Sequence, residues 1–408
     1  NQKYWHFLWR RANGLLSDYS FSRVDLAPVE SAEVFARSVA QSNPDAGKQQ
    51  ALVKWHGASL ALRSSLPQSL VRVYLQYGMH TEPSPVKLFS TSPIAVPSDR
   101  GHHMHYQLGV QTTGDAGAAV DAELLFLGCR ILESLNMGSF VVRLNTVGDL
   151  PSKQTYMRAL RDFLRVNQKK LSTKVVALVK EHPFRALAQL AQEDAELAKE
   201  APQSVEHLSD EARGHFKRLL EFLDEGQVPY MIDHTLLTTD DYATHTVWEF
   251  ILNTDTQVST GGIVVIRGGR MDRMSELLGG PKTPSAGWTL DVDTLVKLME
   301  AKNLNVPDIG AKPKVFLSQL GEAAKRRSLM LFEEIRKSGI EVRYSLSRDN
   351  IKGQLRMAER LGVRFALIFG QKEALEGTVM VRELETGIQE TIPLEKIIDE
   401  LKKRLKAK

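Results

Sequence analysis

Segments with the pattern of β-strands occur in groups in the first three quarters of the chain, with helical segments between the groups. They cover residues 86–89, 105–112, 140–145, 248–252 and 263–267, and several are bounded by glycine. A parallel sheet would require a strict alternation of strand and helix. The grouping instead predicts an α+β domain in which a mostly antiparallel sheet is flanked by helices.

Helical patterns precede these strands. Trp5, Leu8 and Leu16 recur at helical spacing near the N-terminus, which predicts an amphipathic helix there. A second helix is predicted around residues 34–39 after an extended stretch. Residues 50–80 also have a helical pattern, so we expect a helix over this segment.

A long helical segment separates two strand-containing parts. Residues 152–227 are charged, have helical periodicity and contain no strand signal, so we expect a helical insert between a first core part, 1–151, and a second, 228–305. Several helix and strand breakers then follow, namely Pro307, Asp308, Gly310 and Pro313. They predict a linker over residues 306–313.

Residues 314–408 have the pattern of a separate α/β module. Strands are predicted at 315–317, 341–344, 365–369, 378–383 and 391–393, and helices at 322–338, 351–361 and 394–406. Residues 311–408 contain 21 Lys and Arg against 14 Asp and Glu, a net charge of +7, whereas the remaining residues have a net charge of −3. Such a basic module is typical of a surface that binds a polyanion, and a well-solvated surface explains the charge equally well.

Membrane insertion and disulfide chemistry are not expected. No apolar run approaches the roughly 20 residues of a membrane-spanning helix, and the first residues lack the layout of a signal peptide. The single cysteine, Cys129, excludes an internal disulfide and suits a reducing compartment. We therefore expect a cytoplasmic protein without a membrane partner. Cys129 lies in an apolar run, which predicts a buried helix position and not a catalytic thiol.

Short strings in both parts of the chain match one family in order and spacing. They are Glu33-Val34-Phe35-Ala36-Arg37-Ser38-Val39, Gln107-Leu108-Gly109, Asp121-Ala122-Glu123, Gly268-Gly269-Arg270-Met271-Asp272, Leu320-Gly321-Glu322, Leu361-Gly362-Val363-Arg364-Phe365 and Glu390-Thr391-Ile392-Pro393-Leu394. The chain resembles the histidyl-tRNA synthetase family. The resemblance implies a class II aminoacyl-tRNA synthetase core with a helical insert, a C-terminal α/β anticodon-binding-type domain, a homodimer, and tRNA or another RNA as partner.

The residues that carry the family's chemistry are largely replaced. A synthetase brings a carboxylate to the α-phosphate of ATP, so it needs fixed cations around the reacting groups. By resemblance, three family arginines fall at Pro93, Thr238 and Thr294. No catalytic residue and no cofactor are therefore expected, and the loss of these cations argues against ATP binding. Lys54 or Arg100 could replace a lost arginine, but a lysine lacks the bidentate geometry of a guanidinium group.

The histidine pocket implied by the resemblance is altered as well. The family's Arg-Pro-Glu-Gly-Thr segment is aligned with residues 54–58, which puts Lys54 and His56 in the pocket. The family's acidic ring-binding residue falls at Gln111, and two of its pocket tyrosines fall at Ala243 and Met271. The residues that persist are Gln107, Tyr242, Gly268 and Gly269, and each has a structural explanation too, such as close sheet packing for the glycines.

Two further clusters have the composition of a ligand site. His102, His103 and His105 are close enough to suggest a metal, but two imidazoles without a nearby carboxylate or thiol make a poor site, so no metal site is predicted. Gly261-Gly262 and Gly268-Gly269 flank an apolar strand. Neither pair opens a helix, so sheet packing explains them better than phosphate binding.

Polar and basic residues gather at the start of the second helix of the C-terminal module. They are Arg348, Asn350, Lys352, Gln354 and Arg356. Cations at a helix N-terminus suit RNA phosphates, and amide side chains can read base edges. The alternative is an ordinary capped helix that faces solvent. The family resemblance favours RNA binding, because these positions match the segment that faces the anticodon.

Three functions remain open. The first is a non-catalytic paralogue with a binding or regulatory role that retains tRNA binding. The second is a regulatory subunit of ATP phosphoribosyltransferase, which has a protein partner, although such paralogues usually lack the anticodon domain. The third is a divergent but active histidine–tRNA ligase whose cations come from elsewhere.

Overall fold

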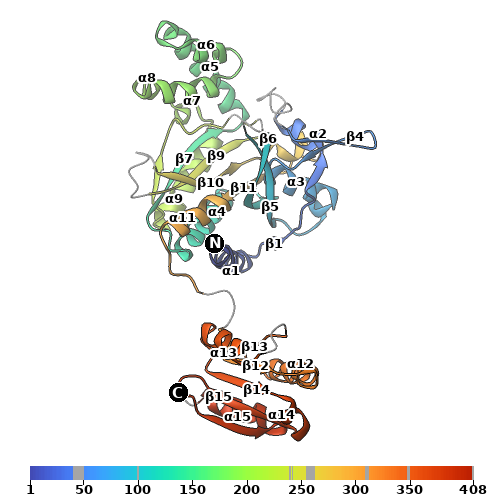
Figure 1. Cartoon of the computed structure of the whole chain (residues 1–408). Helices are drawn as coiled ribbons and strands as arrows, with labels where there is room; N and C mark the ends of the chain where they lie inside the picture. The colour runs from blue at the N-terminus through green and yellow to red at the C-terminus, as the bar shows by residue number, and fades with distance from the viewer. Residues whose placement is uncertain are drawn as a thin grey trace. The chain divides into compact units, whose positions relative to one another are not determined.

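The structure, a computed structural model, describes residues 1–39, 50–98, 101–238, 240, 242–253, 262–307, 312–346 and 350–406. The chain divides into two compact units, Asn1–Asn305 and Val306–Lys408 (Figure 1). The division falls where the expected linker begins. Each unit has its own sheet and its own apolar core, so the two are described separately.

An eight-stranded sheet forms the centre of the first unit, in the order β1-β5-β6-β11-β10-β9-β7-β8. The strands are β1 (Ser22–Arg23), β5 (Val86–Ser98), β6 (Gly101–Thr113), β7 (Phe140–Gly148), β8 (Tyr230–Ile232), β9 (Thr244–Leu252), β10 (Ile263–Arg270) and β11 (Ser285–Asp291). Among the described residues of this sheet, only β1 with β5 and β7 with β8 pair in parallel. The predicted α+β domain with a mostly antiparallel sheet is confirmed.

Helices cover both faces of this sheet. Trp288 of β11 donates from Nε1 to the carbonyl of Leu124, which places α4 (Ala118–Ser134) on its face. The neighbouring Gly109 lies beneath Leu66, so α3 (Leu66–Gln76) covers the other face. The predicted N-terminal helix is α1 (Gln2–Asp18), which packs on α4 and on α11 (Val292–Ala301), and α9 (Asp210–Glu225) also packs on α4. The remaining helices outside the insert are α2 (Ala32–Val39), α10 (Met274–Leu277) and the 3-10 turn η1 (Met79–Thr81).

The expected helical insert forms a bundle at one end of the first unit (Figure 1). It comprises α5 (Leu150–Val166), η2 (Gln168–Lys170), α6 (Thr173–Val179), α7 (Pro183–Glu193), α8 (Ala195–Lys199) and η3 (Ser204–His207), whereas α9, the last helix of the expected insert, packs on α4. Asp149 caps α5 by accepting from the backbone N–H of Ser152, and the bundle surrounds a core of Leu160, Leu164 and Leu187. Its contacts with the sheet keep it within the first unit.

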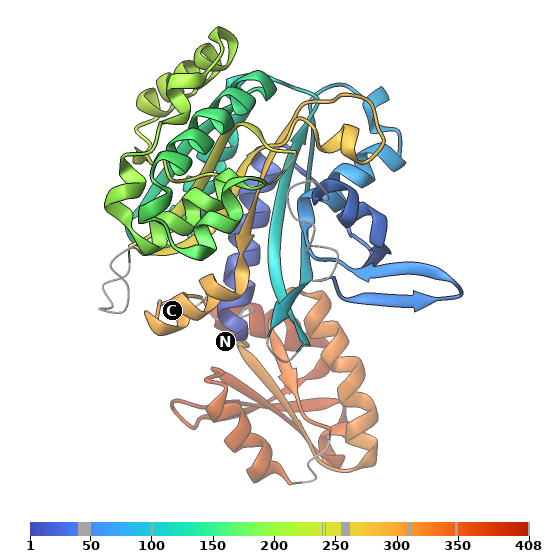
Figure 2. The same ribbon diagram turned by 90° about the horizontal axis from the view of Figure 1, so that it is seen from above.

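The helix expected over residues 50–80 is wrong in its first half. Residues 52–62 form a hairpin of β3 (Leu52–Trp55) and β4 (Ala58–Leu62), and β4 pairs with β2 (Val29–Ser31). His56 and Gly57, which form the turn, both have positive φ angles, a conformation that stops a helix. The hairpin extends away from the body of the unit (Figure 2), and only α3 is helical in this stretch, apart from the short η1 turn.

The second unit contains a five-stranded sheet in the order β13-β12-β14-β15-β16. Its strands are β12 (Val315–Gln319), β13 (Val342–Tyr344), β14 (Phe365–Phe369), β15 (Thr378–Glu383) and β16 (Gln389–Pro393), and its helices are α12 (Glu322–Lys337), α13 (Ile351–Arg360), α14 (Gln371–Glu376), η4 (Leu394–Lys396) and α15 (Ile397–Lys406). β13, β12 and β14 are parallel, and β15 and β16 are antiparallel additions. The predicted α/β order is confirmed, and α14 is an element that the sequence pattern missed. Within the described residues of the whole chain, no helix is both long and apolar enough to cross a membrane.

Candidate functional site

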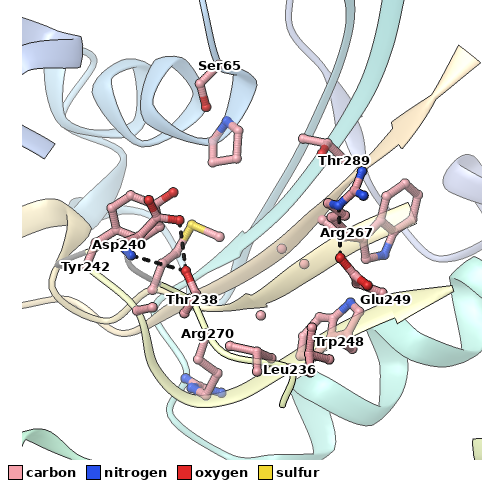
Figure 3. A pocket seen from close by; sticks show the side chains of 18 of the residues that line it. Ser65, Leu236, Thr238, Asp240, Tyr242, Trp248, Glu249, Arg267, Arg270 and Thr289 are labelled. Carbon is pink, nitrogen blue, oxygen red and sulfur yellow. Dashed lines mark hydrogen bonds and ion pairs between the residues drawn. The ribbon is translucent and has the colours of Figure 1, made fainter. Parts of the chain in front are cut away.

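A cavity of about 460 Å³ opens on the α3 face of the eight-stranded sheet (Figure 3). Its floor comes from β9, β10 and β11, one wall from the start of α3, and the opposite wall from the loop between β8 and β9. Residues from all of these segments line it, namely Ser64, Ser65, Pro67, Gln107, Leu236, Thr238, Asp240, Tyr242, Ala243, Val247, Glu249, Arg267, Gly268, Gly269, Arg270, Met271, Gly287 and Thr289 among others.

Two side chains hold the loop wall in place. Asn145 of β7 is fully buried and donates from Nδ2 to the carbonyls of His234, at 3.4 Å, and Leu236, at 3.0 Å. Lys153 of α5 donates to the carbonyls of Asp240, at 3.1 Å, and Ala243, at 3.3 Å. The wall is therefore tied both to the sheet and to the helical insert.

Seven of the expected pocket residues line this cavity, and they are Gln107, Thr238, Tyr242, Ala243, Gly268, Gly269 and Met271. The Thr238 hydroxyl donates to the Asp240 carboxylate at 3.0 Å. Burial, together with the Asp240 carboxylate, raises the pKa of Tyr242 well above its usual value, so the phenol stays protonated. This end of the cavity therefore presents neutral hydroxyl groups and one carboxylate.

The paired glycines have a packing requirement. A Cβ at Gly268 would lie 2.5 Å from the carbonyl of Gly287 and 2.6 Å from Nε1 of Trp248, and a Cβ at Gly269 would lie 2.6 Å from the carbonyl of Thr246. These distances are too short for any side chain. Close approach in the sheet explains both glycines, as the sequence analysis allowed.

Lys54 and His56 do not line the cavity. They lie on the β3–β4 hairpin, where both are exposed, and His56 forms the turn. The cavity is lined instead by Ser64, Ser65 and Pro67. The segment Arg63-Ser64-Ser65-Leu66-Pro67 begins with the same arginine as the Arg-Pro-Glu-Gly-Thr string and reaches the cavity, so its place suits that string better than the place of residues 54–58 does. The expected glutamate position is then Ser65, which still lacks a carboxylate.

Gln111 lies next to the cavity but does not line it. It is 1% exposed, and neither Nε2 nor Oε1 of its amide has a hydrogen-bond partner within the described residues. Its Oε1 lies 2.6 Å from the position that a Cβ on Gly287 would occupy, and Gly287 lines the cavity. An unpaired buried amide costs stability, so a polar group from outside the described residues would stabilise this side chain.

Arg267 lines the cavity and was missed by the sequence analysis. Its Nε donates to Glu249 at 2.9 Å, and its side chain is 64% exposed (Figure 3). Glu249 is also paired with Arg143. The signal was available, because Arg267 precedes Gly268-Gly269 by one residue in a strand, so alternation places it on the same face as Gly269.

Arg270 is a second cation at the cavity, but its charge is already compensated. Its guanidinium group is fully buried and pairs with Asp121 at 2.7 Å and Asp272 at 3.2 Å. Asp121 also contacts His215 at 2.8 Å and Thr246. Burial raises the pKa of Asp121, but His215 and Arg270 outweigh it, so the pKa lies below its usual value and the carboxylate is ionised. This cluster is structural.

Comparisons with known proteins agree with this architecture. The family model described as "Histidyl-tRNA synthetase" matches residues 3–295, and the one described as "Anticodon binding domain" matches residues 314–404. The chain belongs to the histidyl-tRNA synthetase family. A histidine–tRNA ligase of Dehalococcoides mccartyi is 30% identical over 99% of this chain and 97% of its own length, and one of Staphylococcus aureus is 28% identical over the same shares.

Solved structures show the same relationship. The apo histidyl-tRNA synthetase of S. aureus superposes with a TM-score of 0.81 at 25% identity and covers 98% of this chain and 96% of its own. An ATP phosphoribosyltransferase regulatory subunit/histidyl-tRNA synthetase from Bacillus halodurans has a TM-score of 0.63 at 17% identity, covering 90% of this chain and 94% of its own. At that identity the second likeness concerns the fold alone.

The positions aligned with the arginines of histidyl-tRNA synthetases hold no cation. Thr238 lines the cavity, whereas Thr294 lies at the start of α11 and donates from its hydroxyl to Asp291 at 2.8 Å. Pro93 lies within β5, opposite Tyr106 of β6. Shifting the register of β5 does not change this, because its only Lys or Arg is Lys87, which pairs with Glu123 at 2.5 Å. Arg100 lies outside the described residues.

The histidine cluster and the cysteine have structural surroundings. His105 contacts Asp291 through Nε2 at 2.7 Å and Asp293 through Nδ1 at 3.4 Å, while the ring of His103 lies 6.3 Å away. Over the described ranges, no group of three or more His, Cys, Asp or Glu is arranged to hold a metal ion. Cys129 is buried in α4 as predicted, and burial raises the pKa of its thiol to about 12. A thiol with that pKa is unreactive at neutral pH.

The C-terminal candidates divide into structural and surface residues. Asn350 is the N-cap of α13 and accepts from the backbone N–H of Gly353. The RNA-binding role expected for Gln354 is contradicted: it is fully buried and pairs with the backbone of Gln319 through both amide atoms, at 3.0 and 2.6 Å. Lys352 and Arg356 are exposed on one face of α13, and Arg348 lies outside the described residues.

Proposed function

We propose that this member of the histidyl-tRNA synthetase family is non-catalytic and acts as a binding or regulatory protein that recognises tRNA or another RNA through its C-terminal domain. One observation carries the proposal. Several residues that the resemblance assigned to the pocket line the cavity, yet Pro93, Thr238 and Thr294, where the resemblance puts the family's three arginines, have no cationic side chain.

The remaining cations do not replace them. Among the described lining residues, the only Lys or Arg side chains are Arg267 and Arg270. Arg270 is neutralised by Asp121 and Asp272, and Arg267 shares Glu249 with Arg143. Attack of a carboxylate on the α-phosphate of ATP needs cations that stabilise the charge on the phosphate oxygens. Loss of these cations costs several kcal/mol of transition-state stabilisation. The arrangement therefore supports binding without adenylate formation.

RNA binding is supported by the surface of α13. Lys352, Arg356 and Arg360 follow one another at four-residue spacing and are all exposed, so they form one basic face. A row of cations on a helix suits a phosphate backbone. The anticodon-binding family model covers this helix, which agrees with tRNA as the ligand.

Pyrophosphate exchange and tRNA binding on one preparation test the proposal. We expect no histidine-dependent exchange of ATP with pyrophosphate, together with salt-sensitive binding of tRNA. Exchange at a rate typical of a synthetase would contradict the non-catalytic assignment and favour a divergent ligase. Absence of both activities would contradict the RNA-binding role.

Replacement of Arg348, Lys352 and Arg356 by Ala tests the RNA surface. Each lost phosphate contact should lower the slope of log affinity against log salt by about one, so tRNA affinity should fall by at least tenfold at low salt. Ala at Arg165, Lys169 and Lys170 of the insert removes the same charge and serves as the control. Equal losses in both triple variants would mean that only net charge matters.

A homodimer is proposed on the family's precedent, and light scattering of the purified chain measures it directly. The fold shared with the B. halodurans protein favours a second candidate, a regulatory subunit of ATP phosphoribosyltransferase. That role requires a protein partner. Co-purification with a phosphoribosyltransferase catalytic chain, together with absent tRNA binding, would favour it over the first proposal.

A further inference from the structure

The inner end of the cavity differs in chemistry from its mouth. Gln111 and Gly287 are directly opposite each other on β6 and β11, and Gly287 is opposite Gly269 on β10. Directly opposite residues share a face, so Gln111 points to the same side as the cavity floor. Because Gly287 has no side chain, the Gln111 amide borders the cavity at this point, with both polar atoms unpaired within the described residues.

Arg267 offers an anion site at the other side of the cavity. Its Nε is used by Glu249, but no other hydrogen bond or ion pair from the described residues occupies its terminal amino groups. Glu249 also pairs with Arg143, and Arg143 pairs with Asp233 at 3.3 Å, so two guanidinium groups meet two carboxylates and the charges balance before a ligand arrives. One guanidinium fork suits a carboxylate, whereas a phosphate dianion would need more compensating charge.

The distance between Gln111 and Arg267 limits the length of the ligand. Arg267 lies two strands and two residues from Gln111, which puts their Cα atoms about 12 Å apart at ordinary sheet spacing. After both side chains reach inward, the gap suits a small molecule with a carboxylate at one end and a polar group at the other. Asp240 and Gln107 line the same cavity and offer oxygen acceptors for an ammonium group.

The amide of Gln111 selects the polar group. A primary amide presents a donor and an acceptor on one edge, so it pairs with another amide through two hydrogen bonds. A neutral imidazole has its donor and acceptor nitrogens on different edges of the ring, so it can make only one of them. Replacement of a carboxylate at this position by Gln111 thus removes the preference for a ring N–H and favours an amide.

We propose that the cavity binds an α-amino acid with a neutral amide side chain, such as glutamine or asparagine, and that Gln111 and Arg267 determine this specificity. The proposal rests on the proposed function in one respect, since the cavity is taken to bind a ligand and not to activate it.

Titration calorimetry of the full chain with L-glutamine, L-asparagine, L-histidine and AMP tests it. We expect one of the two amide amino acids to bind at least tenfold more tightly than histidine and AMP. Arg267→Ala should weaken this binding by at least tenfold, while Arg165→Ala, which removes an arginine of similar exposure in the insert, should leave it unchanged. Gln111→Met should remove the preference for the amide, and Gln111→Glu should shift it toward histidine.

Histidine or AMP binding as tightly as the amides would overturn the proposal, as would no binding of any amide up to about 10 mM. Arg267 is exposed, so its replacement tests the site even if a Gln111 variant fails to fold. Pyrophosphate exchange measured on the same samples keeps the two proposals apart, because exchange contradicts the non-catalytic assignment whatever the calorimetry gives.

Discussion

Two buried glutamines show how the surroundings of a residue decide its contribution to stability. Gln354 pairs both amide atoms with the backbone of Gln319, whereas the Gln111 amide has no partner within the described residues. A buried polar group without a hydrogen bond costs about 1–3 kcal/mol. The same chemical group therefore stabilises one site and destabilises the other.

Methionine at each of these positions makes a matched pair. Gln111→Met should raise the free energy of unfolding of the first unit by about 1 kcal/mol, because it removes an unpaired amide without changing the volume greatly. Gln354→Met should lower that of the second unit by about 2 kcal/mol, because it leaves the Gln319 backbone unpaired. Calorimetry on the ligand-free protein measures both, and a destabilised Gln111→Met would mean that the amide has a hidden partner.

The Arg270 cluster predicts a dependence on pH. Arg270→Met removes the cation beside buried Asp121, which then keeps only its contacts with His215 and Thr246, and should cost about 3–5 kcal/mol at pH 7. In the unaltered protein the pKa of Asp121 is below its usual value, so its contribution to stability is present above about pH 4 and is lost as pH falls through the lowered pKa. In the variant, loss of the cation raises the pKa of Asp121, so this carboxylate becomes protonated and uncharged at a higher pH. The loss in free energy of unfolding caused by Arg270→Met should therefore shrink as the pH is lowered toward 4.

Urea unfolding at several pH values measures the difference between Arg270→Met and the unaltered protein. Arg267→Met is the control, since its exposed guanidinium should change stability by less than about 0.5 kcal/mol. A cost for Arg270→Met that does not change with pH would exclude the Asp121 carboxylate as its origin.

At the scale of elements, the eight-stranded sheet and the β3–β4 hairpin differ in how deeply they bury a tryptophan. Trp248 of β9 is 1% exposed, and Trp55 of the β3–β4 hairpin is 64% exposed. Trp248→Ala should destabilise the first unit by about 3–5 kcal/mol, and Trp55→Ala by less than about 0.5 kcal/mol. Urea unfolding monitored by circular dichroism compares them, and a large loss for Trp55→Ala would show that the hairpin is packed in solution.

Elements with a long, regular pattern were predictable, and short ones were not. Strands such as β7 and β9 have enough β-branched and aromatic residues to identify them, and the helices of the insert have clear caps. The hairpin of residues 52–62 was assigned to a helix because its apolar stretches, residues 51–53 and 60–62, are too short to distinguish a strand period from a helix period. Its turn at His56-Gly57, the only local signal, was outweighed by the helical pattern around it.

The predicted site residues differ in whether the structure brings them to the cavity. Thr238, Tyr242 and Met271, which the resemblance assigned to the pocket, line the cavity, and Met271 belongs to a string of five residues that match the family. Lys54 and His56 were misplaced because the Arg-Pro-Glu-Gly-Thr string was aligned with residues 54–58, whereas residues 63–67 form the segment that reaches the cavity. The buried position of Gln354 depends on a pairing with Gln319 that is 35 residues away, so no local pattern reveals it.

For the whole molecule, the presence of two cores predicts two unfolding events. The second unit buries its own cluster, which includes Leu317, Phe365 and Leu401, without residues from the first. Units with separate cores unfold independently unless a large interface couples them. We therefore expect differential scanning calorimetry to resolve two transitions, and Gln354→Met to lower only one of them. A single transition shifted by variants in either unit would contradict this independence.

The hydrogen bonds from Lys153 to the Asp240 and Ala243 carbonyls have a thermodynamic consequence. They make one wall of the cavity an extension of α5, so displacement of that helix alters the wall, and occupation of the cavity alters the helix. Linkage requires the two effects to be equal in free energy. A macromolecule that binds the insert and moves α5 would therefore change the affinity of the cavity for its ligand by some factor. The ligand would change the affinity of the insert for that macromolecule by the same factor.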